Sequence, residues 1–328
     1  MRISRMRERN GFFMKKRIGG LLVAIAVSLA AAGCKEGASV PESSGMEKEM
    51  PSPVSSVQPD YQDGTLTYSN LAGDQSRREV EEILLAAGIP EKYVDMLFLW
   101  VNDFNQCMSK CETFHLIDGF VTEDIPVVDY GDYYPMSTTW FKTNQRKYGD
   151  VLCRIAAFLL MQDQITAKAL IEEELWECWQ DTQWLYSDND AISNNPLIDF
   201  DQKQQSLYYT VYNPVTITPG CPAEEMAACI SEEWQRRGIS FAEGRVSLIT
   251  IWTQYETQTA AAHAAVLVQD GDAYLLLEKT NPQSPYQATR FSTVEQVKQY
   301  MYESIHIEDV RYDMETGTYI VMENDRML

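Results

Sequence analysis

The sequence predicts an α+β fold, in which helices from the N-terminal part pack on a C-terminal antiparallel sheet. Up to Gly238, several separate segments have apolar residues that recur every three or four positions, as on the buried faces of helices. After Val246 they form short runs between turn signals, as strands do. Helices followed by strands are typical of α+β domains. With 45% hydrophobic residues among 328, the chain can form a sizeable core.

Three helices are expected in the first half of the chain. The first begins at Asp74 and ends at Gly88, and Pro90 starts the second, because Pro is favoured at the beginning of a helix. The third spans 151–162, with Asp150 as its N-terminal cap. It is apolar on most sides, so it should lie in the centre of the domain.

The middle of the chain has a mixed pattern. Residues 122–134 are acidic and include aromatic residues and Pro, which predicts a loop with short extended pieces. Residues 166–184 continue a helical pattern. Residues 187–222 are polar and rich in Asn, Asp and Gln, which indicates an insertion or a long connection. A further helix is predicted over 223–238, ending at Gly238.

The C-terminal part should form the sheet. Strands are expected over 247–255, 263–269 and 274–280. A helix over 293–304 and a last hairpin that turns at Thr316-Gly317 then complete the domain.

One predicted hairpin brings a histidine to an acid. Asp270-Gly271 between two apolar runs is typical of a two-residue turn. With these two residues in the loop, counting outward along both strands pairs His263 with Glu278. Directly opposed residues lie roughly 4.5–5.5 Å apart at Cβ, which is close enough for a carboxylate to orient an imidazole.

The N-terminus has the features of a lipoprotein signal peptide. A basic stretch at 14–17 precedes apolar residues 18–32, which are too few for a comfortable membrane span. Small residues then lead directly to Cys34. This pattern resembles a bacterial lipobox, which implies removal of residues 1–33 and lipidation of Cys34. An ordinary secretory signal with an incidental Cys34 is the alternative.

The charge of the mature chain limits its partners. Residues 34–60 are rich in Ser, Pro, Glu and Gly, as in a disordered tether, which leaves 61–328 as a single domain. Removal of residues 1–33 takes away seven basic residues and one acidic residue, so the net charge changes from −21 to −27. Such a surface repels nucleic acid. Attachment to the extracytoplasmic face of the cell membrane is therefore expected through the Cys34 lipid alone.

Cys153, His263 and Glu278 are the candidate catalytic residues. Cys153 lies near the start of the predicted 151–162 helix, where backbone N–H groups and the helix dipole favour a thiolate. The same N–H groups can stabilise an oxyanion. His263 would move the proton, and Glu278 would hold the imidazole.

This order of residues resembles the papain-like and transglutaminase-like cysteine enzymes, which implies a core of that kind. Glu278 corresponds to the acidic residue of the transglutaminase-like group, and Asn281 is the alternative orienting residue. Papain-like enzymes also place a Gln before the cysteine as an oxyanion donor. Gln145 is the candidate here, although it lies farther upstream than in that family, and Asn144 is equally suitable.

A second resemblance covers about 65–304. It rests on five short runs, at 67–71, 100–105, 153–158, 278–279 and 285–287. They resemble a domain-of-unknown-function family of Gram-positive bacterial lipoproteins. This resemblance supports lipidation and the extent of the domain, and it implies no activity.

Other chemistry is weakly indicated. Cys107, Cys111 and His115 would share one face of a continuing helix and could bind zinc, but no fourth ligand is evident. The sequence contains no phosphate-binding loop or dinucleotide fingerprint, so neither a metal nor a cofactor is expected. If Cys34 is lipidated and Cys153 stays free, five cysteines remain, which permit at most two disulfides.

The sequence therefore favours a lipid-anchored cysteine hydrolase or acyltransferase that acts on a peptide or amide bond outside the cell. The alternative is a non-catalytic surface or solute-binding lipoprotein on a papain-like scaffold. A Cys153 sulfur near His263 in an open cleft would favour the enzyme. A Cys153 sealed among apolar side chains would favour the alternative.

Overall fold

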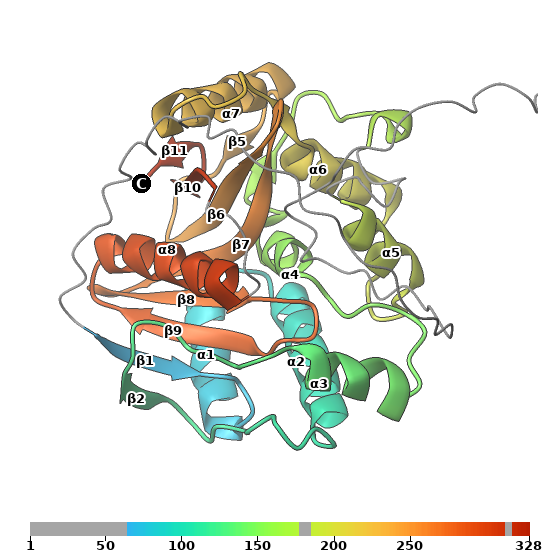
Figure 1. The fold of residues 1–328 in the computed structure, drawn as a ribbon, viewed down its shortest axis with the longest axis vertical. Coiled ribbons are helices and arrows are strands. Elements are labelled where there is room, and N and C mark those ends of the chain that lie inside the picture. The colour runs from blue at the N-terminus through green and yellow to red at the C-terminus, as the bar shows by residue number, and fades with distance from the viewer. Residues whose placement is uncertain (1–63, 177–184, 312–316) are drawn as a thin grey trace, which may run out of the picture.

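The computed structural model describes residues 64–176, 185–311 and 317–328. The predicted signal peptide, Cys34 and the tether lie outside these described residues. Within them, the chain forms eight α-helices and a large antiparallel sheet (Figure 1). This architecture confirms the predicted α+β class.

The large sheet has the strand order β11-β10-β6-β7-β8-β9-β1-β2, and β4 pairs with β7 outside this path. A separate small sheet joins β3 (Ile165–Thr166) and β5 (Ser240–Phe241). The strands of the large sheet are β1 (Thr65–Ser69), β2 (Val121–Asp124), β4 (Val215–Thr216), β6 (Val246–Tyr255), β7 (Gln258–Asp270), β8 (Ala273–Lys279), β9 (Tyr286–Phe291), β10 (Tyr319–Glu323) and β11 (Arg326–Met327).

Helices cover both faces of the sheet. They are α1 (Asp74–Ala86), α2 (Glu91–Met108), α3 (Tyr134–Thr138), α4 (Cys153–Met161), α5 (Tyr186–Asn194), α6 (Gln202–Tyr212), α7 (Ala223–Arg237) and α8 (Val294–Arg311). A π-helical turn, η1 (Thr139–Thr143), and a 3-10 turn, η2 (Glu173–Leu175), complete the regular elements of the described chain. Among these helices, none combines the length and the apolar character that a membrane crossing requires.

Two hydrophobic clusters lie on opposite faces of the sheet. Helix α8 covers one face, where Met301 packs in one cluster with Ala265 of β7. Helices α1, α2, α4 and α7 cover the other face, where Phe158 of α4 belongs to the same cluster as Val266 of β7 (Figure 1). The side chains of Ala265 and Val266 thus point to opposite faces of the sheet, as those of successive residues in a strand do.

The sheet is not purely C-terminal, contrary to the sequence prediction. Strand β1 pairs with β9, and β2 pairs with β1, so the N-terminal part supplies one edge. In β1, Leu66 and Tyr68 alternate inward and are buried. Five residues give too short an alternation to be recognised without the neighbouring strand.

Two predictions for the middle of the chain were wrong. The described part of 166–184 is mostly irregular, with a 3-10 turn at Glu173–Leu175, and the N–H groups of Lys168 and Ala169 bond to the carbonyls of Gly238 and Arg237 at 3.2 and 3.3 Å. The polar stretch 187–222 contains α5 and α6. Asp201 and Gln204 form a capping box at the start of α6, and Tyr208 and Tyr212 are buried on it.

The predicted β7–β8 hairpin exists, but its register was predicted wrongly. Gly271 and Asp272 form the loop, so Asp270 pairs with Ala273, and Glu278 pairs with Ala265. Gly271 has a φ of +63°, and glycine tolerates a positive φ at the first loop position. The observed partner of Glu278 is thus two positions along β7 from the predicted one. Because side chains alternate between faces with a period of two, His263 and Glu278 still lie on one face of the sheet.

The C-terminal elements also differ from the prediction. Helix α8 continues to Arg311, well beyond 304. The last hairpin joins β10 to β11 through Asn324-Asp325, and Asn324 has a φ of +51°. Asn is one of the few residues with a side chain that tolerates this conformation.

Candidate active site

Cys153 is the first residue of α4. Leu152 is the N-terminal cap and contributes no side-chain hydrogen bond, so the first N–H groups of the helix have no partner within the described residues. The prediction that Asp150 caps this helix was wrong. Oδ1 of Asp150 accepts from the N–H of Val151 at 2.8 Å, and Oδ2 lies 2.9 Å from Nζ of Lys279. Cys153 therefore lies at the positive end of the helix dipole.

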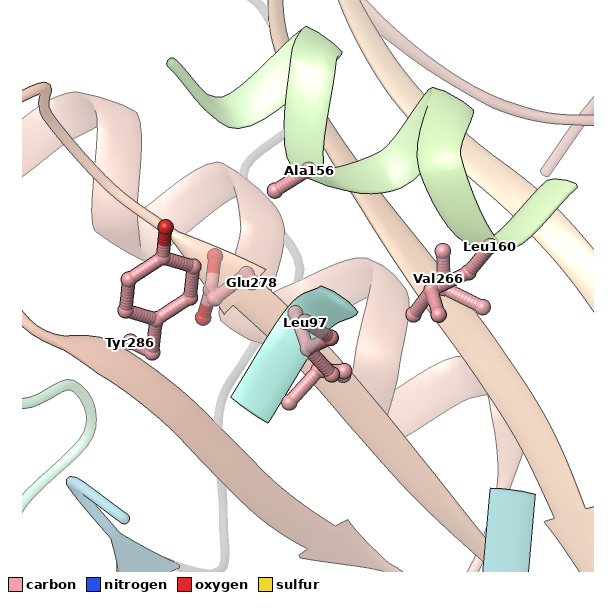
Figure 2. A pocket seen from close by; sticks show the side chains of 7 residues that line it. Leu97, Ala156, Leu160, Val266, Glu278 and Tyr286 are labelled. Carbon is pink, nitrogen blue, oxygen red and sulfur yellow. The ribbon is translucent and has the colours of Figure 1, made fainter. Parts of the chain in front are cut away.

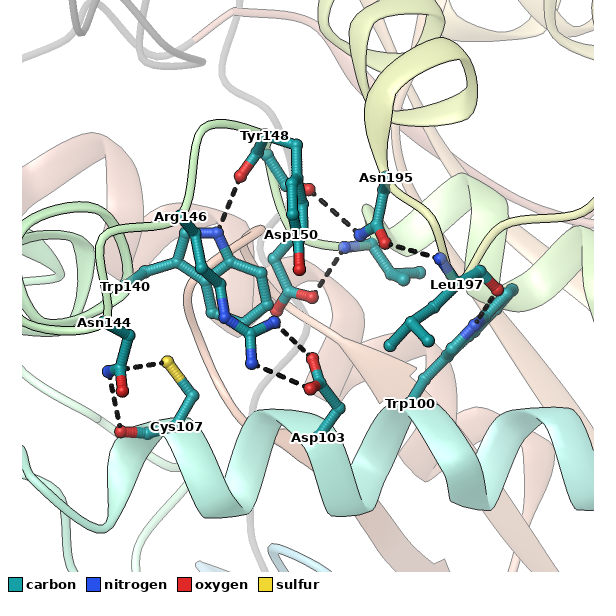
Figure 3. A network of polar contacts seen from close by, with 12 residues as sticks. Trp100, Asp103, Cys107, Trp140, Asn144, Arg146, Tyr148, Asp150, Asn195 and Leu197 are labelled. Atoms are coloured by element: carbon teal, nitrogen blue, oxygen red, sulfur yellow. Dashed lines mark hydrogen bonds and ion pairs between the residues drawn. The ribbon is translucent and has the colours of Figure 1, made fainter.

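A polar network holds the loop that leads into α4 (Figure 3). Arg146 donates to both carboxylate oxygens of Asp103 on α2, and its guanidinium lies 4.1 Å from the ring centre of Trp140. Trp140 Nε1 donates to the carbonyl of Tyr148 at 2.8 Å. Asn195 Nδ2 donates to the carbonyl of Gly149 at 3.1 Å. Because these contacts come from three directions, the start of α4 is fixed relative to α2 and α5.

Arg154, the residue after Cys153, holds α4 in place through buried hydrogen bonds. Arg154 Nε donates to Asp188 Oδ1 at 2.8 Å, and Nη2 donates to Oδ2 of the same carboxylate. Tyr208 on α6 also donates to Asp188, which is fully buried. Arg154 Nη1 donates to the carbonyl of Ala261 on β7 at 2.8 Å. A single guanidinium thus connects α4 to α5, α6 and the sheet.

His263 and Glu278 meet on neighbouring strands. Nε2 of His263 lies 2.7 Å from Oε2 of Glu278. A bulge in the β6–β7 ladder, next to the Ile251–His263 pair, interrupts the regular spacing of β7 at this point. The contact runs along the diagonal of the ladder, since Ala265 is the direct partner of Glu278.

The thiol reaches His263 where the sheet is open. Strand β8 pairs with β7 only from Ala265 onward, and β4 pairs only with Gln258 and Thr259. Residues 260–264 therefore have no strand partner on this edge within the described chain. The N-terminus of α4 lies against this gap, and Cys153 is near enough to His263 for each side chain to shift the pKa of the other. Because Nε2 is paired with Glu278, Nδ1 is the nitrogen left for the sulfur.

Further hydrogen bonds hold Glu278 from the opposite side. The hydroxyl of Tyr300 on α8 donates to Oε1 at 2.5 Å, and Gln287 Nε2 donates to that hydroxyl at 2.7 Å. The hydroxyl of Tyr130 donates to Gln287 Oε1 at 2.8 Å. Gln287 is also the direct ladder partner of Glu278. The carboxylate is therefore oriented by a chain of buried groups that ends on α8 and on the loop after β2.

The charges of the three groups support one another. Burial raises the pKa of the Cys153 thiol, but the hydrogen bond and the charge of His263 outweigh burial, and the pKa lies below its ordinary value. Burial lowers the pKa of His263, but its contacts with Cys153 and Glu278 raise that pKa to about 10. Each of the two groups therefore favours the charged form of the other.

The site is enclosed. Cys153 is 7% exposed and His263 is 5% exposed. A cavity of about 10 Å³, about the size of one water molecule, lies between α2, α4 and the sheet (Figure 2). Its lining comprises Leu97, Ala156, Leu160, Val266, Leu277, Glu278 and Tyr286. The low exposure of both side chains differs from the open cleft that would favour an enzyme.

The other candidate residues lie elsewhere. Gln145 is exposed, and the structure gives it no contact with Cys153. Asn144 instead donates to the sulfur of Cys107 at 3.0 Å. Asn281 donates to Glu308 at 3.5 Å and does not bond to His263.

The possible zinc ligands do not share a helix face. Helix α2 ends at Met108, so Cys111 and His115 are not on the helix that carries Cys107. Within the described residues no group of three metal-binding side chains occurs. Cys107, Cys111, Cys153, Cys221 and Cys229 all carry free thiols.

Sequence reasoning missed the residues that support the site. Arg154 is visible only as a charge within an otherwise apolar helix, and such a residue normally requires a buried partner. Tyr300, Gln287 and Tyr130 carry no local signal, because they come together only through the fold.

A family model described as "Domain of unknown function (DUF4300)" matches residues 67–328. No curated protein matches the chain, and no solved structure does.

Proposed function

The chain belongs to the DUF4300 family, whose description names no activity, and we propose from the site itself that it is a cysteine hydrolase or acyltransferase. The substrate would be a peptide or amide bond, and the fold would be a variant of the papain-like and transglutaminase-like core. Cys153 attacks the carbonyl carbon, His263 transfers the proton, and Glu278 orients the imidazole. One observation carries the proposal: His263 lies between the thiol of Cys153, at the N-terminus of a helix, and the carboxylate of Glu278.

Alkylation kinetics test the proposal. Iodoacetamide is added to the purified protein at pH 7, and each modified thiol is identified by mass. Cys153 is expected to react fastest in the wild type, more slowly in Glu278→Gln and slowest in His263→Ala, because the acid acts only through the imidazole. Cys107 is the internal control, since burial raises its pKa to about 11. A Cys153 that reacts only after denaturation, or equally fast without His263, would mean that it is a packing residue.

The burial of the site favours a second candidate, a non-catalytic surface or solute-binding lipoprotein on the same scaffold. Its support is the low exposure of Cys153 and His263. In that case the buried ion pair would only hold α4 against the sheet. The alkylation experiment separates the two candidates, because a purely structural Cys153 stays protected in the folded protein.

We also propose that the protein is anchored through a lipid on Cys34 at the extracytoplasmic face of the cell membrane. The sequence before Cys34 supports this location. In cells, Cys34→Ala is expected to release the protein into the medium or to leave the precursor uncleaved. An unchanged membrane fraction and an unchanged electrophoretic mobility would contradict it.

A further inference from the structure

Tyr212, the last residue of α6, carries a buried hydroxyl without a partner. Its side chain is 0% exposed, and within the described residues the hydroxyl makes no hydrogen bond. The two preceding tyrosines of α6 contrast with it, because Tyr208 donates to Asp188 and Tyr209 donates to Asn189. Buried polar groups are nearly always paired, and an unpaired one costs about 1–3 kcal/mol. The Tyr212 hydroxyl therefore lacks an acceptor that a bound molecule can supply.

Buried contacts connect this tyrosine to the start of α4, because Tyr208, against which it packs, donates to Asp188, the carboxylate that holds Arg154 next to Cys153. The ring of Tyr212 packs against Tyr208, with the ring centres 5.0 Å apart. Burial raises the pKa of Tyr212 far above its ordinary value, and the negative charge of Cys153 raises it further. Arg154 and Asp188 are the other charged groups that act on it. The phenol thus keeps its proton and remains a donor beside the thiolate.

We infer that the Tyr212 hydroxyl donates a hydrogen bond to the substrate carbonyl oxygen while Cys153 attacks the carbonyl carbon. This inference rests on the proposed function. The backbone N–H of Cys153 is the second donor, since Leu152 leaves it uncapped. Tyr212 thereby takes the oxyanion role that the sequence suggested for Gln145. The substrate class is an amide, ester or thioester, whose carbonyl oxygen becomes negative in the transition state.

The reaction step is balanced without any further reagent. A sulfur electron pair of Cys153 forms the new C–S bond, and the carbonyl π pair moves onto oxygen. Tyr212 and the N–H donate hydrogen bonds to that oxygen, and no proton leaves Tyr212. When the intermediate collapses, the bond to the leaving group breaks, and the imidazolium of His263 gives its proton to that group.

Two reagents separate this role from a general effect on the thiol. Acylation by p-nitrophenyl acetate passes through an oxyanion, whereas alkylation by iodoacetamide displaces iodide from a saturated carbon and forms none. In Tyr212→Phe, acylation of Cys153 is expected to fall about 100-fold. Alkylation of Cys153 is expected to stay unchanged. The temperature of thermal unfolding should stay the same or rise, because the buried hydroxyl that is removed has no partner in the fold.

Tyr93→Phe is the control. The Tyr93 hydroxyl on α2 donates to Asp163 at 2.9 Å, just beyond the C-terminal end of α4, whereas Cys153 is at the N-terminal end of that helix. Both rates should therefore match the wild type. Equal acylation in Tyr212→Phe and wild type would overturn the inference, and so would a parallel loss of acylation and alkylation. In either case, His263-dependent alkylation of the wild type would leave the proposed function standing. A wild-type Cys153 that neither reagent modifies would contradict both.

Discussion

His263 on β7 reaches Glu278 on β8 along the diagonal of the ladder, with 2.7 Å between Nε2 and Oε2. The direct partner of Glu278 is Ala265, whose small side chain leaves room for this contact. The imidazole then lies over the stretch of β7 that has no β8 neighbour, where α4 begins. This single contact orients the histidine toward Cys153 and leaves its other nitrogen for the sulfur.

The alkylation rate of Cys153 should depend on pH in a defined direction. In the wild type, the rate should reach half of its plateau below pH 9, because His263 lowers the pKa of the thiol. In His263→Ala, burial remains the largest effect and the charge of Arg154 opposes it only in part, so the midpoint should move above pH 9. Rates from pH 5 to 11, with Cys153 identified by mass, measure both midpoints. Coincident midpoints would show that His263 does not act on the thiol.

Loss of the carboxylate that anchors Arg154 should destabilise the whole domain. Asp188→Asn leaves a buried guanidinium without its counter-charge, which should cost about 3–5 kcal/mol of unfolding free energy. Arg236→Ala is the control, since Arg236 pairs with Glu233 on the surface with its side chain 71% exposed and should cost less than about 1 kcal/mol. Urea unfolding followed by circular dichroism measures both. Equal losses in the two variants would contradict a structural role for the Arg154–Asp188 pair.

The buried Asp150–Lys279 pair should behave differently from its separate members. Lys279→Met alone leaves a buried carboxylate without a cation, with an expected cost of about 3–5 kcal/mol. The double variant Asp150→Asn, Lys279→Met should be close to the wild type, because both desolvation costs are removed together. A double variant as unstable as Lys279→Met would show that the pair itself stabilises the fold.

The same pair predicts a pH effect on stability. Burial, only partly offset by Lys279, raises the pKa of Asp150 from 3.8 to about 6. Because the folded-state pKa is the higher one, the stabilising contribution of Asp150 is fully present below pH 3.8 and is lost as the pH rises through 6. In Asp150→Asn this loss should be absent. Unfolding free energies of both proteins between pH 4 and pH 7 check the sign.

Gly271 should be required for the β7–β8 turn. Its φ of +63° is unfavourable for a residue with a side chain, although a Cβ at this position would meet nothing within 4 Å. Gly271→Ala should therefore cost about 1–2 kcal/mol through the backbone alone. Gly244→Ala is the matched control, since a Cβ there also meets nothing within 4 Å and no positive φ is involved. A similar stability of the two variants in thermal unfolding would exclude this turn geometry.

Much of the fold is encoded by local patterns in the chain. The α+β class, the starts of α1 and α2 and the position of α7 follow from helical spacing and from Gly and Pro. The same reasoning placed Cys153 near the start of a buried helix and brought His263 and Glu278 to one face of a hairpin. These features are predictable because periodicity, turn residues and helix ends depend on residues that are close in sequence.

The tertiary structure decided the rest. Turn geometry at Gly271 set the register, and pairing with β9 brought β1 into the sheet. The partners Arg154–Asp188 and Tyr300–Glu278, and the unpaired hydroxyl of Tyr212, join segments that are far apart in the chain. No local pattern encodes such contacts, because they depend on which side chains the packed helices and strands bring into the same buried space. The sequence by itself determined the candidate nucleophile and base, and only the fold determined what surrounds them.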